Sequence, residues 1–203
     1  MHNLADSLVQ GEIISRTLEE ELVKKTLVIV DHPHFDTSVI TRRWTEELRK
    51  FPEEFVVHNL QSSYPRGQID PALEHSLIEN NGTVVFQFPV YWFNCPPLLK
   101  QWFDLVLTSD WAFGKGSKLE NRKMALAVSC GSGESDYSAS GKHGRPIEDY
   151  LLPLIHSFEY CHASYAGCFH FLGAANPEIA TVENIAANAK AYVEFLRSIA
   201  QAD

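Results

Sequence analysis

The chain has 203 residues, of which 45% are hydrophobic and 21% are charged. This composition is typical of one globular domain whose core is large enough to need no disulfide or metal support. Seventeen Lys and Arg against 26 Asp and Glu give a net charge of −9, which disfavours nonspecific binding to nucleic acids or anionic membranes.

Cysteine usage and hydropathy predict a cytoplasmic protein. No CxxC pair is present, and two of the four cysteines lie in apolar runs, so we expect reduced thiols without a disulfide framework. The four are Cys95, Cys130, Cys161 and Cys168. No apolar run approaches the ~18 residues of a membrane span, so we expect no membrane insertion. Reduced thiols are typical of the cytoplasm.

Residues 1–25 precede the first strand-like run and lack a signal-peptide pattern, because acidic residues are frequent among them. The spacing of Leu18, Leu22 and Val23 fits one face of a helix. We interpret residues 1–25 as a helical arm or extension that packs on a partner subunit. A floppy end is the open alternative. Residues 26–203 then form the domain itself.

Five apolar, β-branched runs alternate with helix-like segments in the rest of the chain. In order, the expected strand and helix pairs are 26–31 with 38–51, 54–60 with 70–81, 83–88 with 96–108, 123–129 with 146–161, and 165–173 with 181–200. Strands that are apolar throughout are buried on both faces, as in parallel sheets. The pattern therefore predicts an α/β fold: a doubly wound, five-stranded parallel sheet with helices on both faces.

Five such units match the flavodoxin-like strand order 2-1-3-4-5. The notable loops of this sequence follow the first, third and fourth strands, which are neighbours in that order. Because parallel strands end at the same edge of the sheet, we expect these three loops to converge on one site.

The first loop, residues 31–40, leads from a strand into a helix. Free amides and the positive end of the helix dipole favour a phosphate there. The loop has neither GxGxxG nor GxxxxGK[ST], so a dinucleotide Rossmann site and a P-loop are unsupported. His32 and His34 could add proton donors. The alternatives are turn histidines beside an ordinary N-cap, or a metal pair, for which nothing nearby supplies further ligands; we expect no metal.

The second loop has the unusual sequence PVYWFN, residues 89–94. We expect Pro89 to end the strand pairing, since it has no N–H, and the prolines at 96 and 97 to open the next helix. Leu98 to Val106 then form a stripe that faces the core. The three aromatic residues at 91–93 lie outside both elements. They either flank a flat ligand, or plug the end of the sheet or contact a subunit.

The third loop, residues 129–144, is rich in Gly and Ser. Gly131 and Gly133 allow the backbone to approach a ligand and present its amides. Tyr137 and His143 follow in the same loop, and a phenol and an imidazole can donate or relay a proton. An ordinary surface turn is the competing interpretation.

Four collinear segments together resemble the NAD(P)H:quinone oxidoreductase family of flavodoxin-like flavoproteins. This family includes DT-diaphorase, bacterial NAD(P)H dehydrogenases (quinone) and the ancillary subunit of glutathione-gated potassium efflux. The segments are HP at 32–33 with a helix-opening serine, FPVYWF at 88–93 continuing to WAFG at 111–114, SCGSG at 129–133 with the Tyr and His that follow, and YLLPL at 150–154 with YC at 160–161. The likeness spans about residues 26–200.

The resemblance implies a flavin held non-covalently by the three loops, and it assigns residues to its parts. The ribityl phosphate would be held by His32, Ser38, Val39 and Ile40. The isoalloxazine ring would be contacted by Pro89, Val90, Tyr91, Trp92 and Phe93. The pyrimidine end would be met by Ser129, Cys130, Gly131 and Ser132. Tyr137 and His143 match the pair implicated in proton relay and substrate contact.

The sequence departs from the family pattern in places. The family often has Asn after the loop serine, where Thr41 stands nearby. The typical Thr-Gly-Gly is Cys130-Gly131-Ser132 here, so the second glycine is a serine. These changes remove no catalytic group but put flavin affinity and potential in doubt.

The resemblance implies a reductase that passes hydride from NAD(P)H through the flavin to a quinone-type acceptor by a ping-pong mechanism. We expect FMN rather than FAD because no adenine site is visible; Asp104 matches an acid near the adenosine of FAD-using relatives, so FAD stays open. Family members are usually homodimers. The alternatives are a regulatory ancillary subunit of a potassium-efflux transporter, a flavodoxin-like electron carrier, and a flavodoxin-like domain without flavin.

Overall fold

The computed structural model describes residues 24–201, so most of the predicted arm at 1–25 lies outside the described residues. Five parallel strands form one sheet in the order β2-β1-β3-β4-β5, which confirms the predicted topology. The strands are β1 (Thr26–Val30), β2 (Phe55–Asn59), β3 (Val84–Pro89), β4 (Lys123–Cys130) and β5 (Ser164–Leu172).

Six α-helices and two short 3-10 helices connect the strands in this part of the chain. They are η1 (Phe35–Thr37), α2 (Ile40–Leu48), α3 (Leu60–Ser63), α4 (Pro71–Asn80), α5 (Pro97–Val106), η2 (Glu134–Tyr137), α6 (Ile147–Tyr160) and α7 (Val182–Gln201). The five long helices fall within the ranges expected from periodicity, to within a residue or so at the carboxyl end of α7. No helix among residues 24–201 is long and apolar enough to cross a membrane.

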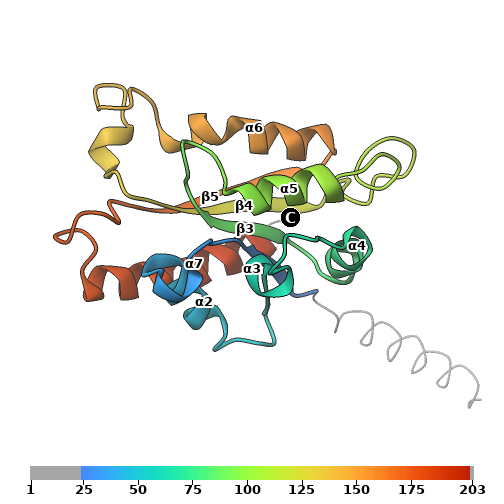
Figure 1. Cartoon of the computed structure of the whole chain (residues 1–203), viewed down its shortest axis with the longest axis horizontal. Helices are drawn as coiled ribbons and strands as arrows, with labels where there is room; N and C mark the ends of the chain where they lie inside the picture. The colour runs from blue at the N-terminus through green and yellow to red at the C-terminus, as the bar shows by residue number, and fades with distance from the viewer. Residues whose placement is uncertain (1–23, 202–203) are drawn as a thin grey trace, which may run out of the picture.

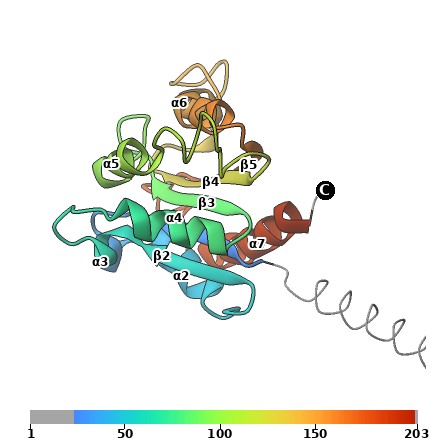
Figure 2. The same cartoon turned by 90° about the vertical axis from the view of Figure 1, so that its right-hand side faces the viewer.

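Helices cover both faces of the sheet (Figures 1 and 2). On one face α2 and α7 pack over a core that includes Trp44, Tyr192 and Leu196. On the other, α4, α5 and α6 enclose a second core around Phe86 and Trp102. The central strands β1 and β3 are fully buried, as strands between two helical layers must be.

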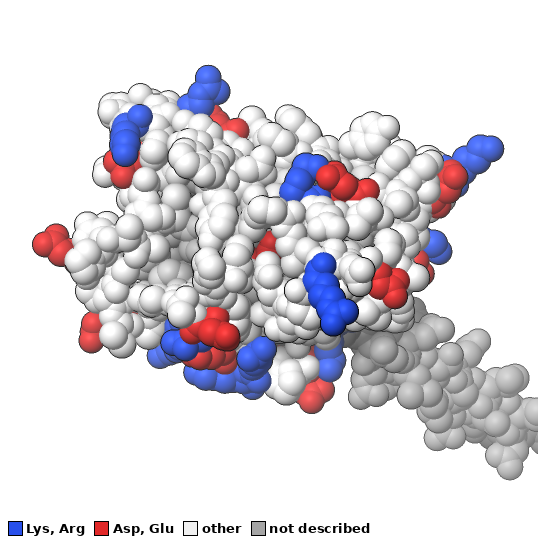
Figure 3. All heavy atoms as spheres, viewed as in Figure 1, with Lys and Arg blue, Asp and Glu red and all other residues white. Residues whose placement is uncertain are grey.

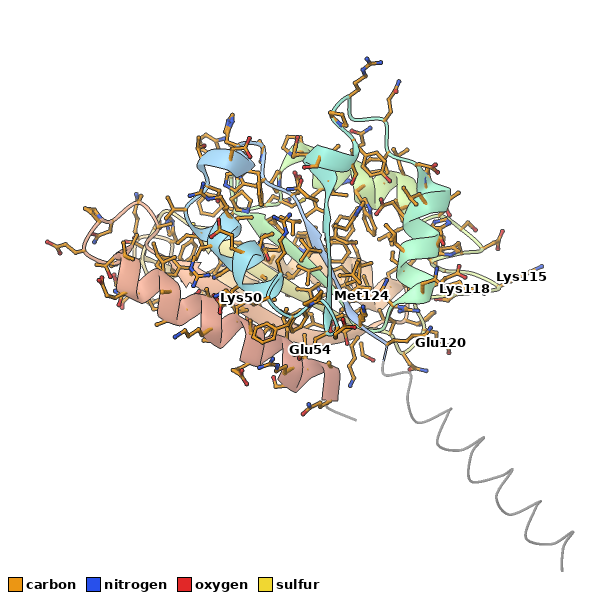
Figure 4. The ribbon with its side chains drawn as sticks, turned by 90° about the horizontal axis from the view of Figure 1, so that it is seen from below. Lys50, Glu54, Lys115, Lys118, Glu120 and Met124 are labelled. Atoms are coloured by element: carbon orange, nitrogen blue, oxygen red, sulfur yellow. The ribbon has the colours of Figure 1, made fainter. Side chains whose placement is uncertain are left out.

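The amino-terminal edge of the sheet is closed by polar contacts (Figure 4). Glu54, just before β2, lies beside α7 and accepts two hydrogen bonds from Arg197, at 2.8 Å from Nε and 2.7 Å from Nη2. The guanidinium also lies 4.6 Å over the ring of Phe51. This arrangement joins α7 to the start of the edge strand β2.

Pro89 is the last residue of β3, opposite Ser129, so our expectation that it ends the pairing is wrong. The carbonyl of Gln87 points toward β1, where it accepts a hydrogen bond from the Asp31 amide at 3.0 Å. The Val90 amide points to the other side and donates to the Ser129 carbonyl of β4 at 2.8 Å. Position 89 therefore faces the β1 side, beyond the end of β1. The missing N–H of proline removes no ladder bond there.

The edge strand β5 has nine residues and is not regular. Its register with β4 shifts between Met124 and Leu126. Close to this shift, Gly167 has a φ of 113°, a left-handed conformation that side chains disfavour. The strand therefore carries a bulge in its first half.

Candidate functional site

A hollow of about 380 Å³ lies at the carboxyl ends of β1, β3 and β4. Its walls come from the three loops that the sequence singled out and from the loop between β5 and α7. Lys and Arg are scattered with Asp and Glu over the face seen in Figure 3, but none of the described residues that line the hollow is a Lys or Arg. Backbone groups rather than basic side chains must therefore supply positive potential in the hollow.

The first wall is the amino-terminal end of α2. The Ser38 hydroxyl accepts a hydrogen bond from the Thr41 amide at 3.1 Å and so fixes the first turn. No side chain caps the helix at Val39, which is 60% exposed. The first amides of a helix lack intrahelical partners, and the dipole adds positive potential. This end of α2 is suited to an anionic group.

His32 stands beside this helix end in a defined tautomer. Its Nδ1 accepts a hydrogen bond from the His34 amide at 3.0 Å, so a neutral ring carries its proton on Nε2. Burial lowers the pKa of His32, and the nearby His34 lowers it further. The ring therefore offers a neutral N–H donor. Within residues 24–201, no three His, Cys, Asp or Glu side chains are grouped to hold a metal.

The aromatic loop forms a tight two-residue turn. Tyr91 and Asn94 exchange both backbone hydrogen bonds, at 2.8 and 3.0 Å, around Trp92 and Phe93. Both central residues are left-handed, with φ of 50° and 62°, which costs roughly 1–2 kcal/mol for each non-glycine residue. Trp92 is 94% exposed, whereas Phe93 packs on Tyr150 with 4.7 Å between ring centroids.

Asp31 anchors the helix that follows this turn. The carboxylate is fully buried and accepts hydrogen bonds from the Leu99 amide, in the first turn of α5, and from Gln61 Nε2, both at 2.8 Å. Burial raises the pKa of Asp31, and these two hydrogen bonds oppose the rise. One side chain at the end of β1 thus joins α3 and α5 beside the hollow.

The third wall is the loop after β4, and the carbonyl groups at its start are engaged. Those of Cys130, Gly131 and Ser132 accept hydrogen bonds from the amides of residues 174, 175 and 173, at 2.8, 3.3 and 2.7 Å. The segment 173–175 follows β5, next to β4 in the sheet. With the carbonyls held on that side, the loop's own amides of Gly131 and Ser132 have no partner among residues 24–201. These amides are available to a ligand.

Tyr137 and His143 come together in the structure, as their loop predicts. Their rings lie 4.5 Å apart between centroids. The phenol of Tyr137 is buried and lies 3.1 Å from Cys130 Sγ, and the His143 Nε2 lies 3.1 Å from Ser132 Oγ. Burial raises the pKa of Tyr137 far above its ordinary value, and the contact with Cys130 adds to the rise. The phenol therefore stays protonated at neutral pH, so it can donate a hydrogen bond or a proton but cannot serve as a base.

Ten of the thirteen predicted cofactor residues line the hollow. They are His32, Ser38, Val39, Ile40, Pro89, Val90, Tyr91, Ser129, Cys130 and Gly131. Ser132 lines a second hollow, of about 600 Å³, that shares Cys130 and Gly131 with the first. Trp92 and Phe93 line neither. Ala174 lines the first hollow and was missed by sequence reasoning, although its position just after β5 could have suggested it.

A model of the flavodoxin-like fold family matches residues 24–196. The chain belongs to this family. A flavodoxin-like relative, the uncharacterized NAD(P)H oxidoreductase YrkL of Bacillus subtilis, is 37% identical over 86% of this chain and 98% of its own length. Together these likenesses confirm the quinone oxidoreductase family that the four sequence segments resemble.

Two further flavodoxin-like relatives bear on the site. The crystal structure of general stress protein 14 from Treponema denticola in complex with FMN is 41% identical, with a TM-score of 0.81 over 86% of this chain and 99% of that one. The glutathione-regulated potassium-efflux system ancillary protein KefG of Yersinia pestis is 31% identical over 86% of this chain and 94% of its length.

Proposed function

We propose that this protein is a flavin-dependent NAD(P)H dehydrogenase that uses FMN to reduce a quinone-type acceptor. One observation carries the proposal: the amino-terminal end of α2 and the unpartnered amide of Gly131, in the loop after β4, border the same hollow. An anionic tail and a flat, polar-edged ring are the two parts of FMN that such groups fit. The relative bound to FMN supports this choice of flavin.

The residues of the chain fit FMN in three places. The amides of the first turn of α2, which the Ser38 hydroxyl fixes, and the Nε2–H of His32 would hold the phosphate. The segment of Pro89 to Tyr91 would lie along the ring system. The amides of Gly131 and Ser132 would face the pyrimidine end, where fixed donors favour a negative charge. When bound, FMN supplies hydride acceptance and release.

Tyr137 and His143 are placed to serve the acceptor. Both lie in the loop that continues from the proposed pyrimidine contacts, and the buried phenol keeps its proton. We assign them the donation of a hydrogen bond or proton to the acceptor oxygen as it is reduced. NAD(P)H is the proposed donor because of the relative YrkL's name. One open hollow for both substrates favours their binding in turn, which is a ping-pong mechanism.

The test starts from flavin binding. Purified protein stripped of flavin should bind FMN far more tightly than riboflavin, because only FMN has the phosphate that α2 would hold; FAD is the third ligand. A saturating ligand raises stability by RT ln(1 + [L]/Kd), about 2.7 kcal/mol at a hundredfold excess over Kd. Equal affinity for riboflavin and FMN would contradict the phosphate site.

The activity is tested with the FMN-loaded protein. NADPH or NADH should bleach the flavin absorbance under anaerobic conditions, and a simple benzoquinone should restore it. Double-reciprocal plots at several quinone concentrations should be parallel if the two substrates bind in turn. Failure of every simple quinone to restore the colour would remove the quinone assignment, and failure of both nicotinamides would remove the reductase itself.

A second candidate function is regulatory, as an ancillary subunit of a potassium-efflux transporter. The observation that favours it is the likeness to KefG, which covers 94% of that protein. Co-purification with a transporter encoded nearby, and faster potassium efflux in its presence, would support this role. Full reductase activity with no effect on efflux would refute it.

We also propose a cytoplasmic homodimer. The four cysteines are free, as expected of a reducing compartment. Tyr160 is 68% exposed at the end of α6, beside a largely apolar groove of about 460 Å³ between α5 and α6. This face offers a second copy of the chain an apolar contact. Light scattering should give twice the monomer mass, and Tyr160→Glu should reduce it.

A further inference from the structure

The side chain of Ser132 makes a contact that a glycine could not make. It stands where the resembled family has the second glycine of Thr-Gly-Gly. Its hydroxyl lies 3.1 Å from Nε2 of His143, in a partly buried position. Two residues earlier on the same loop, Cys130 touches the phenol of Tyr137 in a similar way, at 3.1 Å. Each departure from the family pattern thus meets one member of the proposed proton-donating pair.

We propose that Ser132 is a positioning residue, whose hydroxyl holds the imidazole of His143 in one orientation beside the flavin hollow. The inference rests on the proposed function for its catalytic meaning. Its structural part, one fixed orientation of the His143 ring, stands on the chain's own contacts and can be measured without turnover.

Ser132 is a suitable anchor because its backbone cannot move freely. Its carbonyl accepts a hydrogen bond from the Gly173 amide at 2.7 Å, and the neighbouring carbonyl of Gly131 accepts one from Ala175 at 3.3 Å. The loop after β4 is in this way tied to the loop after β5. A hydroxyl on such a backbone has a defined place, so a ring that bonds to it is placed as well.

The imidazole needs such a hold. The backbone of His143 is fixed on both sides: its amide donates to the Asp136 carbonyl at 2.9 Å, and its carbonyl accepts from the Tyr150 hydroxyl. The ring itself packs against Tyr137 and Phe93, and these contacts do not fix its rotation about the Cβ–Cγ bond, which exchanges each nitrogen position with a carbon position. Among residues 24–201, Ser132 is the one hydrogen-bond partner of the ring.

The contact with Ser132 determines which nitrogen of His143 is available to other partners. With Nε2 directed to Ser132, Nδ1 is the nitrogen left for other partners. A serine hydroxyl can donate to a bare Nε2 or accept from Nε2–H, so it holds both the neutral and the protonated ring. The titratable groups that face the ring are the phenols of Tyr137 and Tyr150 and, through the backbone contact, Asp136 of η2.

The test compares Ser132→Ala, Ser132→Gly and Ser132→Thr with Ser140→Ala, which removes an exposed hydroxyl three residues before His143. The first readout is the ¹⁵N spectrum of the His143 imidazole in flavin-free protein. Wild type, Ser132→Thr and Ser140→Ala should share one Nε2 shift, set by the hydrogen bond to the hydroxyl at position 132. Ser132→Ala and Ser132→Gly should move the Nε2 shift away from that value, because the hydrogen bond is lost.

The second readout is turnover of the FMN-loaded protein. Ser132→Ala should lower the kcat of quinone reduction about fivefold, the equivalent of one net hydrogen bond, with KM for NAD(P)H unchanged and Ser132→Thr restoring kcat. In a His143→Ala background the same change should have no further effect. Unchanged nitrogen shifts in Ser132→Ala would overturn the inference. Altered shifts in a protein without reductase activity would keep the anchor but refute the proposed function.

Discussion

Replacement of Glu74 by alanine should destabilise the protein more than any other single change on α4. Its carboxylate is fully buried. It accepts hydrogen bonds from Tyr64 OH at 2.5 Å and from Trp102 Nε1 at 2.7 Å, and it lies 2.7 Å from His58 Nε2. Alanine would leave the buried Tyr64 and Trp102 and the half-buried His58 without this partner.

The expected loss is about 3–5 kcal/mol, the usual cost of breaking a buried ionic or hydrogen-bonded group by removing one partner. For a chain of this length about 2–4 °C of melting temperature corresponds to 1 kcal/mol, so the midpoint should fall by roughly 6–20 °C. Urea unfolding of the flavin-free protein, followed by circular dichroism at pH 7, gives the free energy directly.

Glu79→Ala is the matched control. Glu79 lies on the same helix and accepts a hydrogen bond from Trp111 Nε1 at 2.8 Å, but it is exposed. Surface changes of this kind usually stay within about 0.5 kcal/mol. If Glu74→Ala and Glu79→Ala lower the free energy of unfolding equally, the reasoning from burial is wrong.

The loss should also depend on pH in one direction. Burial opposes ionisation of Glu74, but its three hydrogen bonds outweigh that effect and lower its pKa below the ordinary value of 4.5. A lowered pKa in the folded state stabilises the fold above the unfolded-state pKa, and this contribution disappears as the pH falls through the lower, folded-state value. The difference between wild type and Glu74→Ala should therefore shrink below about pH 4.5. A constant or growing difference would contradict the sign.

Four further predictions concern single contacts. Ser38→Ala removes the bond to the Thr41 amide; urea unfolding should show a loss of about 1 kcal/mol, and titration weaker FMN binding. Trp92→Gly relieves a left-handed backbone and should be more stable than Trp92→Ala by about 1 kcal/mol; equal stabilities would deny the strain. Gly141→Ala places a Cβ against the backbone oxygen of Ser135 in η2, so kcat should fall while FMN affinity stays constant. Arg197→Ala removes a surface pair, so its loss in melting temperature should shrink in 1 M salt.

Much of the fold could be predicted because each part depends on local pattern. Continuous apolar strands indicated a parallel sheet, and their number and the three marked loops indicated its order. The convergence of His32, Pro89 and Ser129 on one hollow follows from that order alone. The effect of Pro89 was misjudged because it depends on where β1 ends. A missing N–H removes a ladder bond only if the neighbouring strand extends that far, and β1 lies elsewhere in the sequence.

Other features depend on contacts between distant segments, and no pattern near them in the chain signals them. Glu74 reads as an exposed helix residue until Trp102 of α5 is placed against it. The bond from Ser132 to His143 needs the course of an irregular loop. The part played by residues 173–175 was hidden for another reason: Gly-Ala-Ala carries no side-chain chemistry, and its contribution is made through backbone amides.

The irregularity of β5 affects whether molecules can aggregate by pairing their edge strands. An edge strand of nine residues offers a row of unpaired backbone groups that a strand from another chain could extend. The register shift opposite Met124 and Leu126 and the left-handed Gly167 break that row into two short pieces. An incoming flat strand could match only one piece at a time. The bulge in β5 thus guards the sheet against aggregation.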